Sequence, residues 1–116
     1  MNRGTLFLVS AAALGAVALW LSSARSDAVV AEGRALVAAG ATLVDVRTPA
    51  EFAAGHVRGA VNIPVDDLER RLSELGPTSQ PVVLYCRSGR RSARAKRLLQ
   101  SHGYEQVLDV GPTPRW

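Results

Sequence analysis

The chain has 116 residues and a formal net charge of +4 at pH 7, so it has room for one domain of modest size. Much of the positive charge lies in one stretch without acidic residues, and no aromatic residues are interleaved with it. This pattern excludes a nucleic-acid partner and favours a small anionic ligand. The stretch contains Arg87, Arg90, Arg91, Arg94, Lys96 and Arg97.

The N-terminal segment is uncharged from residue 5 to residue 21 and follows Arg3. It is typical of a secretory signal peptide or of an N-terminal membrane anchor, which makes residues 1–24 a separate unit. As a helix, residues 5–21 would span about 26 Å, which favours an anchor in the inner membrane. The small residues of Ser22-Ser23-Ala24 and Ser26-Asp27-Ala28 favour cleavage and release into the periplasm. Both interpretations predict export to the cell envelope. A buried helix of the domain is disfavoured because the segment is apolar on every face.

Residues 25–116 are predicted to form one domain in which helices and strands alternate. Ser26 or Asp27 is a candidate N-cap for the first helix, and Gly40 a stop signal. The alternation predicts the α/β class with a mainly parallel central sheet. The predicted elements are a helix over 26–39, a strand over 42–46, a short helix over 49–55, a strand over 59–64, a charged amphipathic helix from Asp66 or Asp67 to Leu75, a strand over 81–86, a helix to about His102, and a strand over 106–110.

Cys86 is the only cysteine, so an internal disulfide and a CxxC redox or zinc motif are excluded. It ends the apolar strand 81–86, and ligand sites of parallel sheets lie beyond such strand ends. Gly89 permits a positive φ in the loop that follows, so its N–H groups can form an anion-binding nest at the next helix N-terminus. The nest and the loop arginines favour a nucleophilic thiolate. The alternative is a buried, inert cysteine beside solvated arginines.

Two motifs make the chain similar to rhodanese domains. Residues 45–64 (DVRTPAEFAAGHVRGAVNIP) closely resemble their first signature, and residues 82–95 (VVLYCRSGRRSARA) resemble the active-site loop of single-domain members. The resemblance implies a five-stranded parallel sheet flanked by helices, without a cofactor or metal. It also implies a sulfurtransferase, in which Cys86 takes sulfane sulfur from a donor such as thiosulfate and passes it from a persulfide to cyanide or a thiol.

The loop after Cys86 separates sulfur transfer from phosphate chemistry. Related phosphatases have Cys-x5-Arg, whereas here Arg91 is the fifth residue after the cysteine and Ser92 the sixth. The tighter ring of N–H groups suits one sulfur atom rather than a phosphoryl group, so phosphatase and arsenate-reductase activities are disfavoured. The predicted substrate-binding residues are Arg87, Ser88, Gly89, Arg90, Arg91 and Ser92.

Other residues carry weaker expectations. Asp45 and Arg47 are expected to support the active-site region, with a purely structural ion pair as the alternative. His56 is expected to hold a turn by hydrogen bonds rather than to act as a base. Pro112 replaces a glycine of the family pattern, which alters the expected rim of the pocket.

Two other functions remain open. One is a non-catalytic sulfur-carrier or protein-binding module, tethered to a membrane through residues 5–21, and the other is a redox enzyme that needs an external thiol.

Overall fold

The computed structural model describes residues 10–112 and residue 116. Four strands form one sheet in the order β2-β1-β3-β4, and all neighbouring pairs are parallel. The predicted α/β class with a parallel sheet is therefore confirmed. The elements in chain order are α1 (Ala11–Ala38), β1 (Thr42–Asp45), α2 (Pro49–Ala54), β2 (Val61–Asn62), the 3-10 helices η1 (Val65–Asp67) and η2 (Glu69–Leu75), β3 (Val82–Cys86), α3 (Arg90–Ser101) and β4 (Val107–Pro112).

The sheet has four strands in the described part of the chain, not the five that the resemblance implied. The difference concerns the segment that precedes β1 in the chain. Residues 11–38 are all helical, so this segment supplies no further strand. The shortest strand, β2, pairs with β1 through two residues and forms one edge of the sheet.

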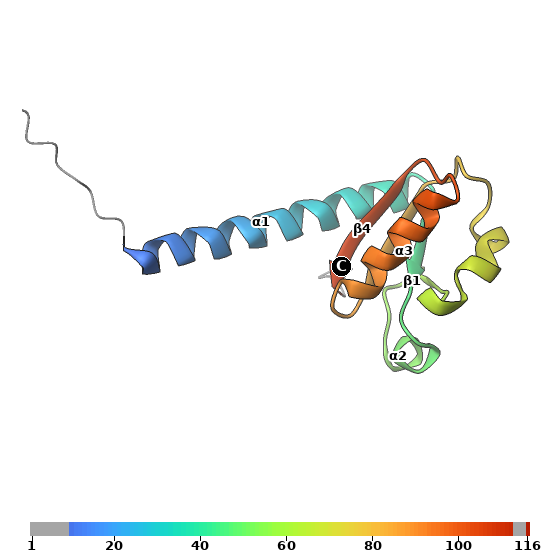
Figure 1. Ribbon diagram of the computed structural model, residues 1–116, viewed down its shortest axis with the longest axis horizontal. Helices are drawn as coiled ribbons and strands as arrows, with labels where there is room; N and C mark the ends of the chain where they lie inside the picture. The colour runs from blue at the N-terminus through green and yellow to red at the C-terminus, as the bar shows by residue number, and fades with distance from the viewer. Residues whose placement is uncertain (1–9, 113–115) are drawn as a thin grey trace, which may run out of the picture.

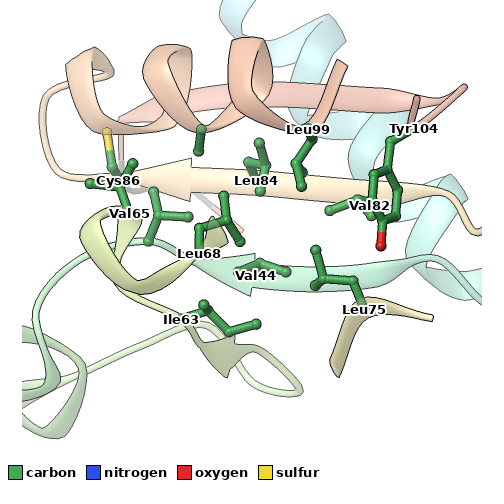
Figure 2. Packing of buried hydrophobic residues seen from close by; sticks show 12 residues of the cluster. Val44, Ile63, Val65, Leu68, Leu75, Val82, Leu84, Cys86, Leu99 and Tyr104 are labelled. Atoms are coloured by element: carbon green, nitrogen blue, oxygen red, sulfur yellow. The ribbon is translucent and has the colours of Figure 1, made fainter. Parts of the chain in front are cut away.

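Both faces of the sheet are covered, because side chains on a strand alternate between the faces. On β3, Val82, Leu84 and Cys86 point into a core shared with α3 and the 3-10 helices (Figure 2). Val83 and Tyr85 point to the opposite side, where the C-terminal part of α1 packs. All five residues of β3 are buried, as expected of a continuous apolar strand inside a parallel sheet.

Helix α1 joins two segments that the sequence predicted as separate. It runs unbroken from Ala11 to Ala38, so the expected boundary between residues 24 and 25 falls inside a helix. Residues 11–28 are exposed, with Leu19 and Trp20 at 75% and 70% exposure, and this half extends away from the sheet (Figure 1). Within residues 10–112, no helix is long and apolar enough to span a membrane. Residues 1–9 of the predicted leader, which spans residues 1–24, lie outside the described residues.

The segment between β2 and β3 differs from the predicted amphipathic α-helix. It forms two 3-10 helices, η1 and η2, with a kink at Arg71. The hydroxyl of Tyr104 donates to the carbonyl oxygens of Leu72 and Gly76, at 3.2 and 2.8 Å. Carbonyls engaged by a side chain in this way favour a tight turn over a regular α-helix.

Gly33 allows α1 to lie against β4. A Cβ at this position would stand 3.0 Å from Val110 Cγ1 and 3.3 Å from Trp116 Cζ3. We expect Gly33→Leu to lower the free energy of unfolding by about 1–3 kcal/mol, because the extra atoms force α1 away from its partners. Urea unfolding followed by circular dichroism measures the change. Gly15→Leu is the matched control, since no atom lies within 4 Å of the Cβ position at Gly15. An unchanged midpoint for Gly33→Leu would contradict the close approach.

Candidate active site at Cys86

Cys86 lies at the carboxyl end of β3, beneath the first turn of α3. Gly89 adopts a left-handed conformation (φ 93°), which turns the chain from the strand into the helix. As a result, the Gly89 N–H donates to Cys86 Sγ at 2.9 Å, and Ser92 Oγ lies 3.3 Å from the same sulfur. Cys86 itself is completely buried. The predicted loop thus forms a small cradle around one sulfur atom.

The Ser92 hydroxyl can form a hydrogen bond with Cys86 Sγ whether the sulfur carries a proton or not. Its oxygen also lies 3.2 Å from the carbonyl oxygen of Gly89. When Cys86 carries a proton, the thiol can donate to Ser92 Oγ while the hydroxyl donates to Gly89. When the sulfur is an anion, the hydroxyl can donate to Sγ instead. The Ser92 hydroxyl can therefore either donate to Sγ or accept from it.

The loop arginines have different surroundings. Arg87 and Arg90 are exposed, and so is Ser88. Arg91, which the sequence predicted to bind substrate, makes a bidentate ion pair with Glu51, at 2.6 and 2.9 Å. Arg94 pairs with Asp66 at 3.0 Å on the surface. The structure thus separates two exposed arginines beside the cradle from two that are engaged with carboxylates.

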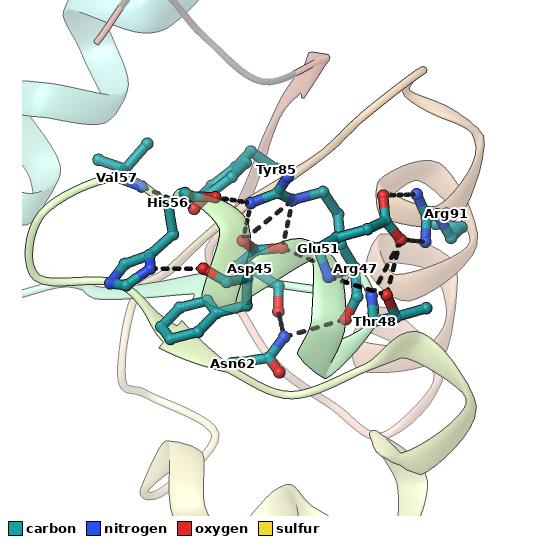
Figure 3. A network of polar contacts seen from close by, with 11 residues as sticks. Asp45, Arg47, Thr48, Glu51, His56, Val57, Asn62, Tyr85 and Arg91 are labelled. Carbon is teal, nitrogen blue, oxygen red and sulfur yellow. Dashed lines mark hydrogen bonds and ion pairs between the residues drawn. The ribbon is translucent and has the colours of Figure 1, made fainter.

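The contact of Glu51 with the loop after Cys86 was missed by the sequence reasoning. A signal was present, because Thr48-x-x-Glu51 is the pattern of a helix capping box. The box forms at the start of α2, where Thr48 N and Oγ1 donate to Glu51 Oε1 at 3.2 and 3.0 Å (Figure 3). The Arg91 guanidinium, and then the Thr48 N–H, lower the pKa of Glu51 from its ordinary 4.5 to about 2. The carboxylate therefore stays ionised at any pH near neutral.

The depressed pKa of Glu51 predicts a pH-dependent contribution to stability. Ionised Glu51 stabilises the fold fully above about pH 4.5, and this contribution is lost as the pH falls from there through about 2. We therefore expect the stability difference between the native protein and Glu51→Gln to be larger at pH 6 than at pH 3. Urea unfolding at the two pH values measures it. Equal differences would argue that Glu51 keeps an ordinary pKa.

Asp45 and Arg47 form a buried ion pair on the other side of the sheet. Arg47 Nε donates to Asp45 Oδ1 at 3.0 Å and Nη2 to Oδ2 at 2.7 Å, while Nη2 also reaches the Gly55 carbonyl oxygen at 2.6 Å. The hydrogen bonds that Arg47 donates to Asp45 raise the pKa of Arg47. Asp45 is paired in register with Tyr85, whose side chain belongs to the core opposite Cys86. Alternation therefore places the Asp45 side chain on the face of the sheet opposite Cys86, and both residues of the pair belong to the first signature.

The first signature is further held by hydrogen bonds to its backbone. Asn62 Nδ2 donates to the carbonyl oxygens of Asp45 and Arg47 at 3.0 and 2.9 Å. The ring of His56 stacks on Phe52, and its Nδ1 lies 2.8 Å from the Phe52 carbonyl oxygen (Figure 3). This contact agrees with the expected role of His56 in holding the turn.

Comparisons with known proteins point to one family. Residues 29–111 match the family model described as rhodanese-like domain. The sulfurtransferase of Allochromatium vinosum is 46% identical over 68 residues, which cover 59% of this chain and 63% of that protein. The thiosulfate sulfurtransferase PspE of Escherichia coli is 38% identical over 69 residues, which cover 59% of this chain and 66% of that protein. The chain thus spans a little under two thirds of the length of these relatives.

A solved structure agrees with the observed topology. The human single-domain sulfurtransferase TSTD1 superposes with a TM-score of 0.60 at 34% identity, over 67% of this chain and 81% of that chain. The superposition and the family match, which covers more than half of the chain, lead to one conclusion. This protein belongs to the rhodanese-like domain family.

Proposed function

We propose that the protein is a sulfurtransferase that carries sulfane sulfur on Cys86. The observation that carries the proposal is the cradle, in which Gly89 N–H and Ser92 Oγ meet Sγ at 2.9 and 3.3 Å. Both donors favour an anionic sulfur at the start of a helix, where the helix dipole acts in the same direction. The sulfurtransferase relatives in the family support the same reaction class.

The proposed reaction is two successive displacements at sulfur. The Cys86 thiolate attacks the outer sulfur of a donor such as thiosulfate, the S–S bond of the donor breaks, and sulfite leaves with the bonding electron pair. An acceptor, cyanide or a thiolate, then attacks the outer sulfur of the persulfide. The Cys86–sulfur bond breaks and the thiolate is restored. Gly89 and Ser92 stabilise the anionic sulfur at the beginning and end of this cycle.

Arg87 and Arg90 support an anionic donor. Both are exposed beside the cradle, and neither forms an ion pair with a described carboxylate. Two exposed guanidinium groups on the loop that follows Cys86 attract a small dianion such as thiosulfate. The donor class thus rests on Arg87 and Arg90, whereas Arg91 is already engaged with Glu51.

The test of the proposed function follows the sulfur atom directly. The full-length protein is incubated with thiosulfate, and intact mass is measured before and after addition of cyanide. We expect a gain of one sulfur atom on Cys86, its loss with cyanide, and formation of thiocyanate. A protein that neither gains the sulfur nor forms thiocyanate would rule out thiosulfate:cyanide sulfur transfer.

A sulfur carrier or protein-binding module is the second candidate. Its specific support is that Cys86 has no exposed surface, so access to the sulfur requires local opening of the site. A carrier would form the persulfide and release it only to a protein partner. Rapid turnover with cyanide or small thiols would exclude this alternative.

We also propose that the chain works in the cell envelope. The support is the exposed half of α1, in which Leu14, Val17 and Trp20 are uncovered, together with the absence of charge between Arg3 and Arg25. An apolar surface of this kind is removed as a leader or is retained against lipid. Intact mass of the protein from separated membrane and periplasmic fractions distinguishes the two fates. Full-length protein found only in the cytosol would contradict export.

A further inference from the structure

The first turn of α3 lacks the usual stabilising groups. The helix follows Gly89 without a side-chain cap, and its first turn contains no acidic residue. Instead it begins with Arg90 and Arg91, whose charges oppose the positive end of the helix dipole. Yet this turn brings the Gly89 N–H and Ser92 Oγ to Cys86 Sγ. The geometry of the cradle therefore depends on a turn that its own sequence does not stabilise.

A carboxylate from a distant part of the chain provides the acidic group that is absent from the first turn of α3. Glu51 on α2 accepts from both terminal nitrogens of Arg91, 40 positions away in sequence (Figure 3). The two side chains are 25% and 31% exposed, so solvent screens the pair only in part. Thr48 fixes the carboxylate from its other side through the capping box. The start of α2 and the start of α3 are thereby joined.

We propose that Glu51 is a positioning residue of the site, which acts through Arg91 to hold the first turn of α3 where Gly89 and Ser92 meet Sγ. In this proposal, Arg91 holds the conformation of the loop and does not bind the sulfur donor. The kinetic consequence rests on the proposed sulfur transfer, whereas the structural consequence does not.

The chain offers well-matched variants for the test. Glu51→Gln removes the charge but keeps an acceptor for the capping box, in which glutamine also serves. Arg91→Gln removes the same ion pair from the other side. Glu74→Gln is the control, because it removes a comparable ion pair with Arg71 on η2. Persulfide formation is measured against thiosulfate concentration, and hydrogen exchange is measured for the amides of residues 89–93.

The expected results distinguish positioning from binding. In Glu51→Gln and Arg91→Gln, the saturating rate of persulfide formation falls about tenfold because the reacting groups lose alignment. The half-saturating thiosulfate concentration stays within about twofold. Amides 89–93 exchange about fivefold faster, the size expected for one partly exposed pair. The double variant is no slower than either single variant, because both remove one interaction. Glu74→Gln behaves as the native protein.

Two results would overturn the inference. The first is an Arg91→Gln variant with a raised half-saturating concentration beside a Glu51→Gln variant with unchanged kinetics, which would make Arg91 a donor-binding residue. The second is unchanged exchange of amides 89–93 in Glu51→Gln. If the native protein forms no persulfide, the proposed function fails, but the exchange measurement still decides whether Glu51 holds the turn.

Discussion

Replacing Cys86 by serine is expected to lower sulfur transfer from thiosulfate to cyanide by more than about a thousandfold, because the nucleophile is removed. A serine hydroxyl is not ionised near neutral pH and does not form a carrier equivalent to a persulfide. The substitution is small, and the hydroxyl can still accept from Gly89 N–H, so the fold should persist. Thiocyanate formation and intact mass after thiosulfate treatment measure the effect.

The matched control for this substitution is Ser73→Ala. Ser73 is exposed on η2, outside the cradle, so sulfur transfer should equal that of the native protein. Transfer by Cys86→Ser at more than a few per cent of the native rate would show that the sulfur passes through some other group, and the proposed mechanism would have to be abandoned.

Replacing Asp45 by alanine is expected to lower the free energy of unfolding by about 3–5 kcal/mol, because Arg47 is left buried without its carboxylate. The Asp45 side chain is fully buried and that of Arg47 is 10% exposed, so water cannot replace the lost contacts. Urea unfolding measures the change. A loss of this size is a large fraction of the stability of a small domain.

Two further variants test whether the loss of stability comes from the buried ion pair or from removing any charged residue. Asp67→Ala removes an exposed pair with Arg70 and should cost less than about 1 kcal/mol. The double change Asp45→Leu with Arg47→Met replaces the pair by apolar side chains and should recover most of the lost stability. Equal losses for Asp45→Ala and Asp67→Ala would contradict a special role for the buried pair.

The elements that the sequence predicted well are those with strong local signals. The uninterrupted apolar run before Cys86 predicted the buried strand β3. Pro49 at the start of α2 and Gly55 after it predicted a short helix, which the structure contains. The glycine and arginines after Cys86 predicted a cradle at the start of a helix. In each case, the physical cause lies within a few residues of the element that it determines.

The features that the sequence did not predict include contacts over longer distances. The pairing of Arg91 with Glu51 joins residues 40 positions apart, so the loop alone gave no sign of this ion pair. The expected helix start at Ser26 was wrong for a different reason. Its hydroxyl donates to the Ser22 carbonyl oxygen at 3.1 Å, which satisfies the serine within a continuing helix. A residue that favours a cap therefore does not by itself end a helix.

The continuity of α1 imposes an order of events on any processing of the N-terminus. Peptidases cut extended backbone, whereas Ala24 and Ala28 both lie within a helix whose later turns are packed on the sheet. If residues 1–24 are removed as a leader, cleavage at either position must therefore precede formation of this helix or wait for its local unfolding.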